Sequence, residues 1–259
     1  RHTRYWRDWS SDVCSSRSPS STPFPTDVLR TSMSTRFFFN EAAGATSFVN
    51  ASAATNPAIC TAPLVCPTAG ASGVRFSNAV EFASGQALKL KNALAITSSQ
   101  PFVASAWIYP TDFSTEMVFI SARNPSQPNK LVLGTTVSGE VFCRFGVNDM
   151  TSSVTIPLNE WTHVICSVGT NKKANLYING APRADAMFTV IPTGNLNVWM
   201  GMDGVSSIAS FIGRLDEVAF YRTAITWDQA ETIYDQYAAA NRRSPTRSRL
   251  TPPPTSSTA

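Results

Sequence analysis

The chain has 259 residues, of which 43% are hydrophobic, so it is long enough to bury a sizeable core in one large all-β domain or two small ones. Its net charge of +4 arises at the two ends, because residues 1–36 and 241–259 carry ten arginines against three aspartates while the body between them is net −3. Nucleic-acid binding needs a concentrated basic surface and membrane insertion needs ~18 consecutive apolar residues, so we expect neither.

The first 32 residues show no sustained hydrophobic period and are rich in Ser, Pro and Arg. The run Arg7–Ser16 has two interpretations: foreign sequence similar to a translated sequencing-adapter read-through, or a native linker between domains. Beyond Asn241, the Arg/Ser/Pro/Thr-rich tail 242–259 is expected to be disordered or a linker. These ends leave residues 33–241 as the folded domain.

Short strands separated by Asn, Pro, Ser and Gly follow one another through the body of the chain, which is typical of a β-sandwich or jelly roll. Pro110 should end one of them because it has no N–H to donate. The expected strands are 36–39, 87–90, 102–109, 117–121, 130–134, 140–146, 152–156, 161–168, 174–179, 195–201 and 208–221.

The clearest stretch is Trp161–Gly180, W-T-H-V-I-C-S-V-G-T-N-K-K-A-N-L-Y-I-N-G. Two alternating segments are joined by the polar turn 169–173, and the second ends in Asn179-Gly180, which tolerates the positive φ angles of a type I′ turn. This pattern predicts an antiparallel meander of two strands and the start of a third.

One helix is expected, at Thr226–Ala240. Thr226 can cap it, with Gln229 as the capping-box partner and Asp228 in the electropositive first turn. Apolar side chains then recur at helical spacing along one face.

Five stretches resemble laminin-G-like domains: F-N-E-A-A-G-A-T-S-F-V-N-A-S-A (39–53), C-P-T-A-G-A-S-G-V-R-F-S-N-A-V-E-F (66–82), F-V-A-S-A-W-I-Y (102–109), W-T-H-V…L-Y-I-N-G (161–180) and G-R-L-D-E-V-A-F-Y-R-T-A-I-T-W-D-Q-A-E-T-I-Y (213–234). The resemblance covers about Arg36 to Ala240. It implies an all-β, concanavalin A-like jelly-roll β-sandwich of two antiparallel sheets with one short C-terminal helix.

The same resemblance implies a calcium ion held by Glu41, Asn50 and Asp216, since calcium takes six or more oxygen ligands. The sequence departs from the family pattern twice: Asn50 stands where Asp is usual, and Ala83 replaces the Asp of F-D-G. Each change removes a charged ligand. The alternative is that Asp216 serves only as a hydrogen-bond acceptor.

Cysteine occurs five times, at positions 14, 60, 66, 143 and 166. Cys60 and Cys66 flank a short loop, and a disulfide there would remove roughly 2–3 kcal/mol of unfolded-state entropy. The alternative is two unrelated small apolar residues. Cys143 and Cys166 lie in strand-like segments and are expected to be buried thiols. The expected disulfide indicates an oxidising compartment.

Catalysis has little support in the sequence, and we expect no enzyme. Glycan-cleaving relatives of the fold use alternate carboxylates of the form E-x-D-x-E, which are absent, and the adjacent Asp216 and Glu217 should point to opposite faces. His2 and His163 are the only histidines, which excludes a histidine metal cluster. His163 is expected to be structural.

The sequence therefore predicts a non-catalytic extracellular or cell-surface module that binds carbohydrate or a surface glycoprotein, within a larger multidomain chain. A structural or adhesive protein–protein spacer and an accessory domain of a glycoside hydrolase remain alternatives. Aromatic rings are the usual sugar platform, but core packing competes for each of them, so no binding residue is chosen. The candidates are Trp107, Trp161, Tyr177, Trp199 and Trp227.

Overall fold

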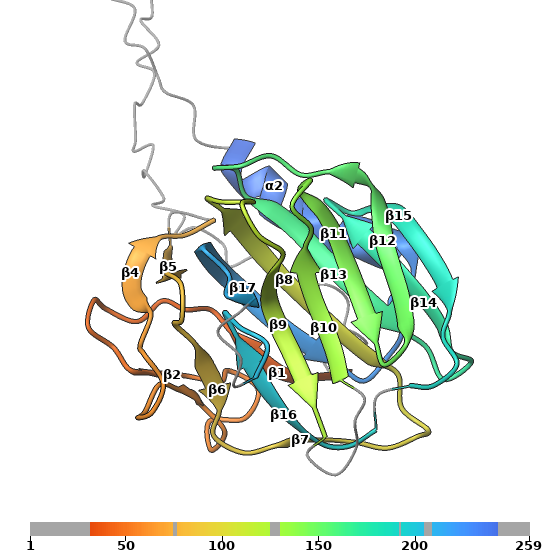
Figure 1. The fold of residues 1–259 in the computed structure, drawn as a ribbon, viewed down its shortest axis with the longest axis horizontal. Helices are drawn as coiled ribbons and strands as arrows, with labels where there is room; N and C mark the ends of the chain where they lie inside the picture. Colours follow the sequence, from red (N-terminus) through yellow and green to blue (C-terminus); the bar gives the residue numbers. More distant parts are fainter. Residues whose placement is uncertain (1–31, 75–76, 125–129, 192, 205–208, 243–259) are drawn as a thin grey trace, which may run out of the picture.

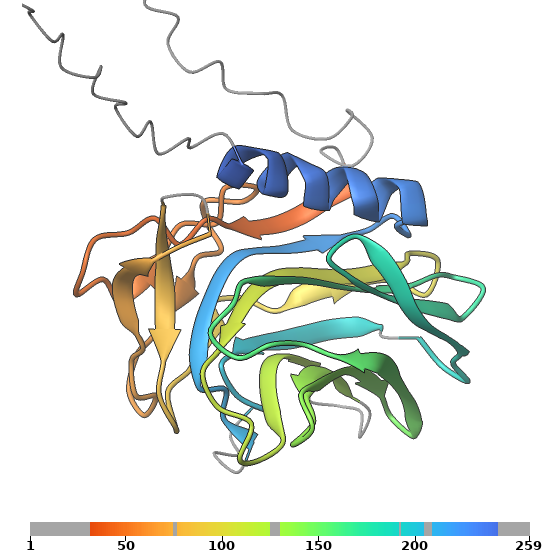
Figure 2. The same ribbon diagram turned by 90° about the horizontal axis from the view of Figure 1, so that it is seen from above.

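The structure, a computed structural model, describes residues 32–74, 77–124, 130–191, 193–204 and 209–242. Two antiparallel sheets lie face to face, and one helix lies on the outer side of the first sheet (Figures 1 and 2). The expected tails, 1–32 and 242–259, fall outside the described residues except for Ser32 and Arg242.

The first sheet, called sheet A, carries the helix on its outer face and contains most of the stretches that resemble the laminin-G-like family. In spatial order its strands are β15 (Ala181–Met187), β14 (Lys173–Ile178), β13 (Thr162–Val168), β8 (Phe102–Pro110), β17 (Gly213–Tyr221), β5 (Asn78–Phe82) and β4 (Thr68–Ser72), with β1 (Met33–Phe37) also paired to β17.

The second sheet, called sheet B, lies on the other side of the core. In order its strands are β12 (Asn148–Thr155), β11 (Glu140–Phe145), β10 (Lys130–Thr135), β9 (Met117–Arg123), β16 (Gly194–Met200), β6 (Leu88–Leu90), β3 (Ala58–Ile59) and β2 (Ser47–Phe48), with β7 (Leu94–Ile96) paired to β16. Many neighbours are far apart in sequence, as in a jelly roll. The predicted all-β jelly-roll sandwich with a C-terminal helix is confirmed.

The central meander forms as predicted. Strands β13 and β14 pair from Val164↔Ile178 to Val168↔Ala174. Asn179 and Gly180 have φ angles of +50° and +78° and turn the chain into β15. Two successive positive φ angles are what a type I′ turn requires.

Some boundaries differ from expectation. Strand β1 covers Met33–Phe37 instead of 36–39, because Phe39 has a φ of +50°, outside the β region. Strand β17 begins only at Gly213, five residues later than expected.

The core between the sheets is rich in phenylalanine, including the fully buried Phe37, Phe102 and Phe119. Cys143 of β11 and Cys166 of β13 lie within it and form a disulfide, so the expectation of two buried thiols is wrong. Inward-facing positions on facing sheets bring the two sulfur atoms together, although they are 23 residues apart.

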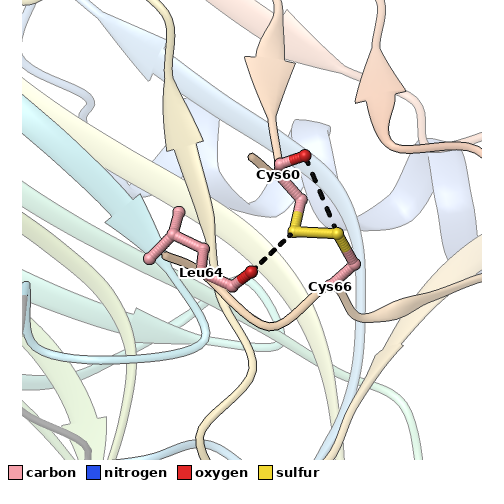
Figure 3. The surroundings of a disulfide bond; sticks show 3 residues. All are labelled: Cys60, Leu64 and Cys66. Carbon is pink, nitrogen blue, oxygen red and sulfur yellow. Dashed lines mark hydrogen bonds between the residues drawn. A yellow bond between two sulfur atoms is a disulfide. The ribbon is translucent and has the colours of Figure 1, made fainter. Parts of the chain in front are cut away.

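A second disulfide joins Cys60 and Cys66 beside β3, with Cα atoms 5.4 Å apart (Figure 3). The carbonyl oxygen of Leu64, within the loop that the bridge closes, lies 3.7 Å from Cys60 Sγ. Two disulfides are compatible with an oxidising compartment. Within the described residues no helix is both long and apolar enough to cross a membrane.

Helix α2 (Trp227–Arg242) packs on the outer face of sheet A. Figure 2 shows it alongside β1 and β17, on the side of the molecule opposite β9–β12. Its first turn has the predicted capping box: Thr226 Oγ1 accepts from the N–H of Gln229, and Gln229 Oε1 accepts from the N–H of Thr226. The helix buries Ala230, Ile233 and Tyr237 against the sheet.

Candidate functional site

The helix divides the outer face of sheet A into a covered part and an open part. Under the helix lie Trp107 of β8 and His163 of β13, whose rings stack with centroids 5.0 Å apart. His163 Nε2 lies 2.9 Å from Ser105 Oγ, and only 2% of the residue is exposed. Burial lowers the pKa of His163 to about 3, because desolvation disfavours the imidazolium ion. This histidine is therefore neutral and sealed from any external ligand.

The open part carries a row of side chains, one step further along each strand than the covered residues. His163 and Trp107 lie under the helix, and Asp216, which pairs with Trp107, is covered by Val74 and Ser77. The positions two residues away are Trp161, Tyr109 and Arg214, and they share this face because alternate residues of a strand do. Pairing continues to β5 and β4, where Arg214 faces Glu81 and Glu81 faces Thr68. We call Trp161, Tyr109, Arg214, Glu81 and Thr68 the aromatic–polar row.

Contacts within this row hold it in place. The rings of Tyr109 and Trp161 lie 5.4 Å apart with a 57° tilt, and the guanidinium of Arg214 lies 5.1 Å from the Tyr109 centroid. Arg214 Nε donates to Glu81 Oε1 at 3.1 Å. Trp161 and Tyr109 are half-buried and Thr68 is exposed, so solvent reaches the row along its length.

A pocket of about 280 Å³ adjoins the polar end of the row. Glu81 and Thr68 belong to both features. The pocket mixes polar groups with apolar walls, as small-molecule sites do. Its other lining residues are Phe82, Ala83, Gln86, Thr111, Ile212 and Gly213.

The outer face of sheet B offers less accessible aromatic surface. Phe142 is fully buried beneath Arg144, whose guanidinium lies 3.7 Å from the ring centroid and pairs with Glu116 and Asp149. Trp199 is 8% exposed, and the ammonium of Lys89 lies 5.2 Å from its ring centroid. The aromatic–polar row is therefore the better candidate site.

The remaining sequence candidates separate clearly by burial. Trp107 and Tyr177 are buried beneath α2, and Tyr177 donates its hydroxyl hydrogen to the carbonyl of Ile225. Trp227 is 56% exposed at the start of α2. Of the five aromatic candidates, Trp161 alone belongs to the row.

The three residues proposed for calcium already serve internal contacts. Asn50 Oδ1 accepts from the N–H groups of Arg36, Ser52 and Ala53, which leaves it no lone pair for a metal. Among the described residues, no group of three or more His, Cys, Asp or Glu side chains is arranged to hold a metal ion.

Asp216 is similarly engaged. Its carboxylate accepts from the N–H groups of Val74 and Glu217 and from the Ser77 hydroxyl. Glu41 differs: Oε1 accepts from Val49 N–H, but Oε2 is buried with no partner among the described residues. Glu41 thus has an oxygen to offer and Asp216 Oδ1 accepts only one hydrogen bond, whereas Asn50 does not fit a calcium site as it lies. Calcium binding stays a prediction.

Asp216 and Glu217 lie on the same side of the sheet, so the prediction that they point to opposite faces is wrong. The register between β17 and β8 shifts between Asp216 and Ala219, and Glu217 has a φ of +50°. Such a bulge places an extra residue on one face. Glu217 therefore reaches toward α2, where its Oε2 accepts from Arg36 Nη2 and from the Tyr237 hydroxyl, each at 2.8 Å.

The sequence singled out Trp161 but missed Tyr109, Arg214 and Glu81 as site residues. Alternation along each strand was the available signal, since Tyr109 shares a face with Trp107 and Arg214 with Asp216. What joins them into one row is the pairing β13–β8–β17–β5, between strands distant in sequence.

The comparisons with known proteins agree with this architecture. The family model described as the concanavalin A-like lectin/glucanases superfamily matches residues 82–231, more than half of the chain. No curated protein gives a significant sequence match. Among solved structures, domain 4 of AbnA, a GH43 extracellular arabinanase from Geobacillus stearothermophilus in complex with arabinotriose, is 20% identical with a TM-score of 0.61, over 78% of this chain and 98% of that domain.

Two other similar structures come from larger chains. The binding domain of Paraclostridial Mosquitocidal Protein 1 is 16% identical with a TM-score of 0.60, over 80% of this chain and 53% of that one. Trypanosoma rangeli sialidase is 12% identical with a TM-score of 0.59, over 80% of this chain and 33% of the sialidase. This chain thus spans about half of the former and a third of the latter. At these identities the likeness shows the fold alone, and the family model shows that the chain belongs to the concanavalin A-like lectin/glucanases superfamily, as a laminin-G-type domain.

Proposed function

We propose that this domain binds carbohydrate, free or on a surface glycoprotein, without catalysing a reaction. The aromatic–polar row carries the proposal. Sugars present apolar C–H faces, which stack on aromatic rings, and hydroxyl groups, which both donate and accept hydrogen bonds. Trp161 and Tyr109 offer the first kind of contact, and Arg214 with Glu81 offers the second.

The neighbouring proteins support this class of partner. The arabinanase domain is described in complex with arabinotriose, and the sialidase acts on a sugar as its name states. Both disulfides suit an oxidising environment, which supports an extracellular or cell-surface location. The mosquitocidal protein's binding domain and the sialidase belong to chains longer than the part that matches, and we extend that arrangement to this protein.

The carboxylates near the row support a non-catalytic role. Hydrolysis of glycosidic bonds usually needs two carboxyl groups about 5–9.5 Å apart that both face the substrate. Glu81 is the single acid among the five side chains of the row. Asp216 is buried against Val74 and Ser77, and the Glu217 side chain is buried against the helix residue Tyr237, so both carboxylates are engaged with protein donors.

The test uses the full 259-residue protein on an array of oligosaccharides, followed by calorimetry of each ligand found. We expect binding that Trp161→Ala removes and that Trp227→Ala, a matched change of an exposed tryptophan away from the row, leaves intact. Absence of any glycan binding would overturn the proposal and leave the structural spacer. Release of reducing sugar during long incubation would contradict the non-catalytic role.

A further inference from the structure

We propose that the aromatic–polar row holds a neutral, linear oligosaccharide that lies across the strands from Trp161 to Thr68. This inference rests on the proposed function and adds the ligand's charge, length and direction. The row crosses five neighbouring chain segments, so it spans about 19 Å at the ~4.8 Å spacing of paired strands. That length suits several linked sugar units and exceeds a single one.

The aromatic end fixes where the chain stacks. Trp161 packs against the buried cluster beneath α2. The Tyr109 ring contacts Trp161 on one side and the Arg214 guanidinium on the other. Half-buried rings that already have neighbours lose little side-chain entropy when a ligand arrives. The 57° tilt between the rings gives two differently oriented platforms, which suits two successive sugar units better than one flat ring.

The centre of the row determines the charge of the ligand. Arg214 and Glu81 neutralise each other, with side chains 28% and 44% exposed. Arg214 uses only Nε toward Glu81, and its other four N–H groups have no partner among the described residues. These groups and the Glu81 oxygens can bond to hydroxyls without a change in net charge. An anionic sugar bonded to these groups would lie beside the negative charge of Glu81, which repels it.

The pocket accounts for the far end. Its volume of about 280 Å³ lies just below the ~300–1,000 Å³ range of complete small-molecule sites, so it suits one unit of a longer ligand. Thr68, Gln86 and Thr111 provide polar groups there, and Phe82 and Ile212 provide apolar walls. A chain stacked on Trp161 and bonded to Arg214 would place a later unit in this pocket.

Calorimetry with the 259-residue chain tests the length and the charge of the ligand together. The neutral probes are arabinose, xylose, glucose, arabinotriose, arabinohexaose, xylohexaose and cellohexaose, and the acidic probes are hexagalacturonate and sialyllactose. We expect at least one neutral hexaose to bind about tenfold or more tighter than its monosaccharide, since each additional contact of ~1.4 kcal/mol gives a factor of ten. Neither acidic probe should bind as well.

Three variants of the row and one control variant test where and how the ligand binds. Trp161→Ala should weaken every neutral ligand about tenfold or more, whereas Trp227→Ala should weaken none. Thr68→Arg should weaken the hexaose and spare the triose, because it obstructs only the far end. Glu81→Gln removes the negative charge beside Arg214 and should raise the affinity for hexagalacturonate several-fold. Thermal melts of each variant exclude misfolding.

The outcomes separate this inference from the proposed function. If an acidic probe binds tightly and Trp161→Ala weakens that binding, the proposal of a neutral ligand is wrong, but the proposed carbohydrate binding stands. Neutral binding unchanged by Trp161→Ala and Thr68→Arg would overturn the position. Equal affinity for monosaccharide and hexaose would overturn the extended ligand. Absence of binding by every neutral and acidic probe would overturn the proposed function itself.

Discussion

Cys143 of β11 and Cys166 of β13 join the two sheets through a disulfide in the middle of the core, with their Cα atoms 6.3 Å apart. Both residues are fully buried. The bridge closes a loop of 23 residues, whereas Cys60–Cys66 closes one of six. Longer closed loops remove more entropy from the unfolded chain.

We therefore expect the Cys143→Ala/Cys166→Ala pair to cost roughly 3 kcal/mol of unfolding free energy, and the Cys60→Ala/Cys66→Ala pair roughly 2 kcal/mol, from the loop lengths. The inter-sheet pair also loses packing at buried positions, which widens the difference. Urea denaturation of both variants beside the unchanged protein measures it. A larger loss from the Cys60/Cys66 change would contradict this order.

The disulfide illustrates which features could be predicted from the sequence. Period-two alternation and the Asn179-Gly180 dipeptide were enough for β8, β13, β14 and their turn, because those signals are local. The partner of Cys143 depends instead on which strands face each other across the core. No local pattern in the sequence encodes that arrangement, so the sequence predicted two separate buried thiols instead of a disulfide.

The candidate site could be predicted from the sequence only in part, for the same reason. Trp161 was visible as a possible platform, but its neighbours Tyr109, Arg214 and Glu81 come from strands joined by non-local pairing. The bulge at Glu217 was also invisible, since its positive φ is carried by a residue that seldom adopts it.

Gly180 supports the contact between the central meander and α2. It has a φ of +78°, and a Cβ there would lie 3.0 Å from Glu231 Cα and 3.1 Å from Tyr234 Cβ. Gly85 has nearly the same φ, +79°, but a Cβ there would meet nothing within 4 Å. Alanine substitutions at the two glycines therefore distinguish the cost of backbone strain, which both share, from the cost of collision with the helix, which only Gly180 has.

Gly180→Ala should lower the unfolding free energy by about 2–3 kcal/mol, against about 1 kcal/mol for Gly85→Ala, which carries the left-handed strain alone. Thermal and urea melts of the two variants provide the comparison. Equal losses would show that the helix gives way without cost, and would contradict a tight contact at this turn.

Arg36, Glu217 and Tyr237 form a buried network that ties β1, β17 and α2 together. Arg36 Nη2 donates to Glu217 Oε2 and to the Tyr237 hydroxyl oxygen, each at 2.8 Å. The side chains of Arg36 and Glu217 are 11% and 8% exposed. Tyr237 also donates to Glu217, and burial raises the pKa of its phenol well above the ordinary value.

Glu217→Ala leaves the Arg36 charge without its carboxylate and should cost about 3–5 kcal/mol. Tyr237→Phe keeps the ion pair and removes one hydroxyl, so we expect about 1–2 kcal/mol. Chemical denaturation gives both values, and Arg214→Ala, whose ion pair is more exposed, is the control with an expected loss below ~1 kcal/mol. A loss of that same size from Glu217→Ala would contradict the importance of burial.

Contrary to the calcium site that the resemblance implies, we expect calcium not to raise the melting temperature of this chain, because Asn50 Oδ1 already accepts three hydrogen bonds and Asp216 Oδ2 two. The measurement compares melts in calcium and in chelator, since a ligand of the native state stabilises it by mass action. If calcium raises the melting temperature and Glu41→Gln abolishes that rise, the expectation is wrong. Calcium would then bind at the Glu41 oxygen that has no partner among the described residues, as the resemblance implies.

Two buried groups, His163 and Asp216, should give this domain opposing pH dependences. Desolvation lowers the pKa of His163 from 6.5 to about 3, so the unfolded chain binds the extra proton below pH 6.5. Its contribution to stability is complete above pH 6.5 and is lost as pH falls toward 3. Desolvation raises the pKa of Asp216 from 3.8 to about 7, so the folded chain holds that proton more tightly. Its contribution is complete below pH 3.8 and is lost as pH rises toward 7.

The two slopes therefore cancel in part between pH 4 and 6.5, and single variants should expose each one. With His163→Gln, which can still bond to Ser105, stability should fall steadily as pH rises from 4 to 7, because the Asp216 contribution acts alone. With Asp216→Asn, stability should instead rise with pH over 3–6.5. Urea midpoints measured at each pH for both variants and the unchanged protein resolve the slopes. Parallel profiles for the two variants would mean that neither group titrates differently in the folded and unfolded chains, and the cancellation would have to be abandoned.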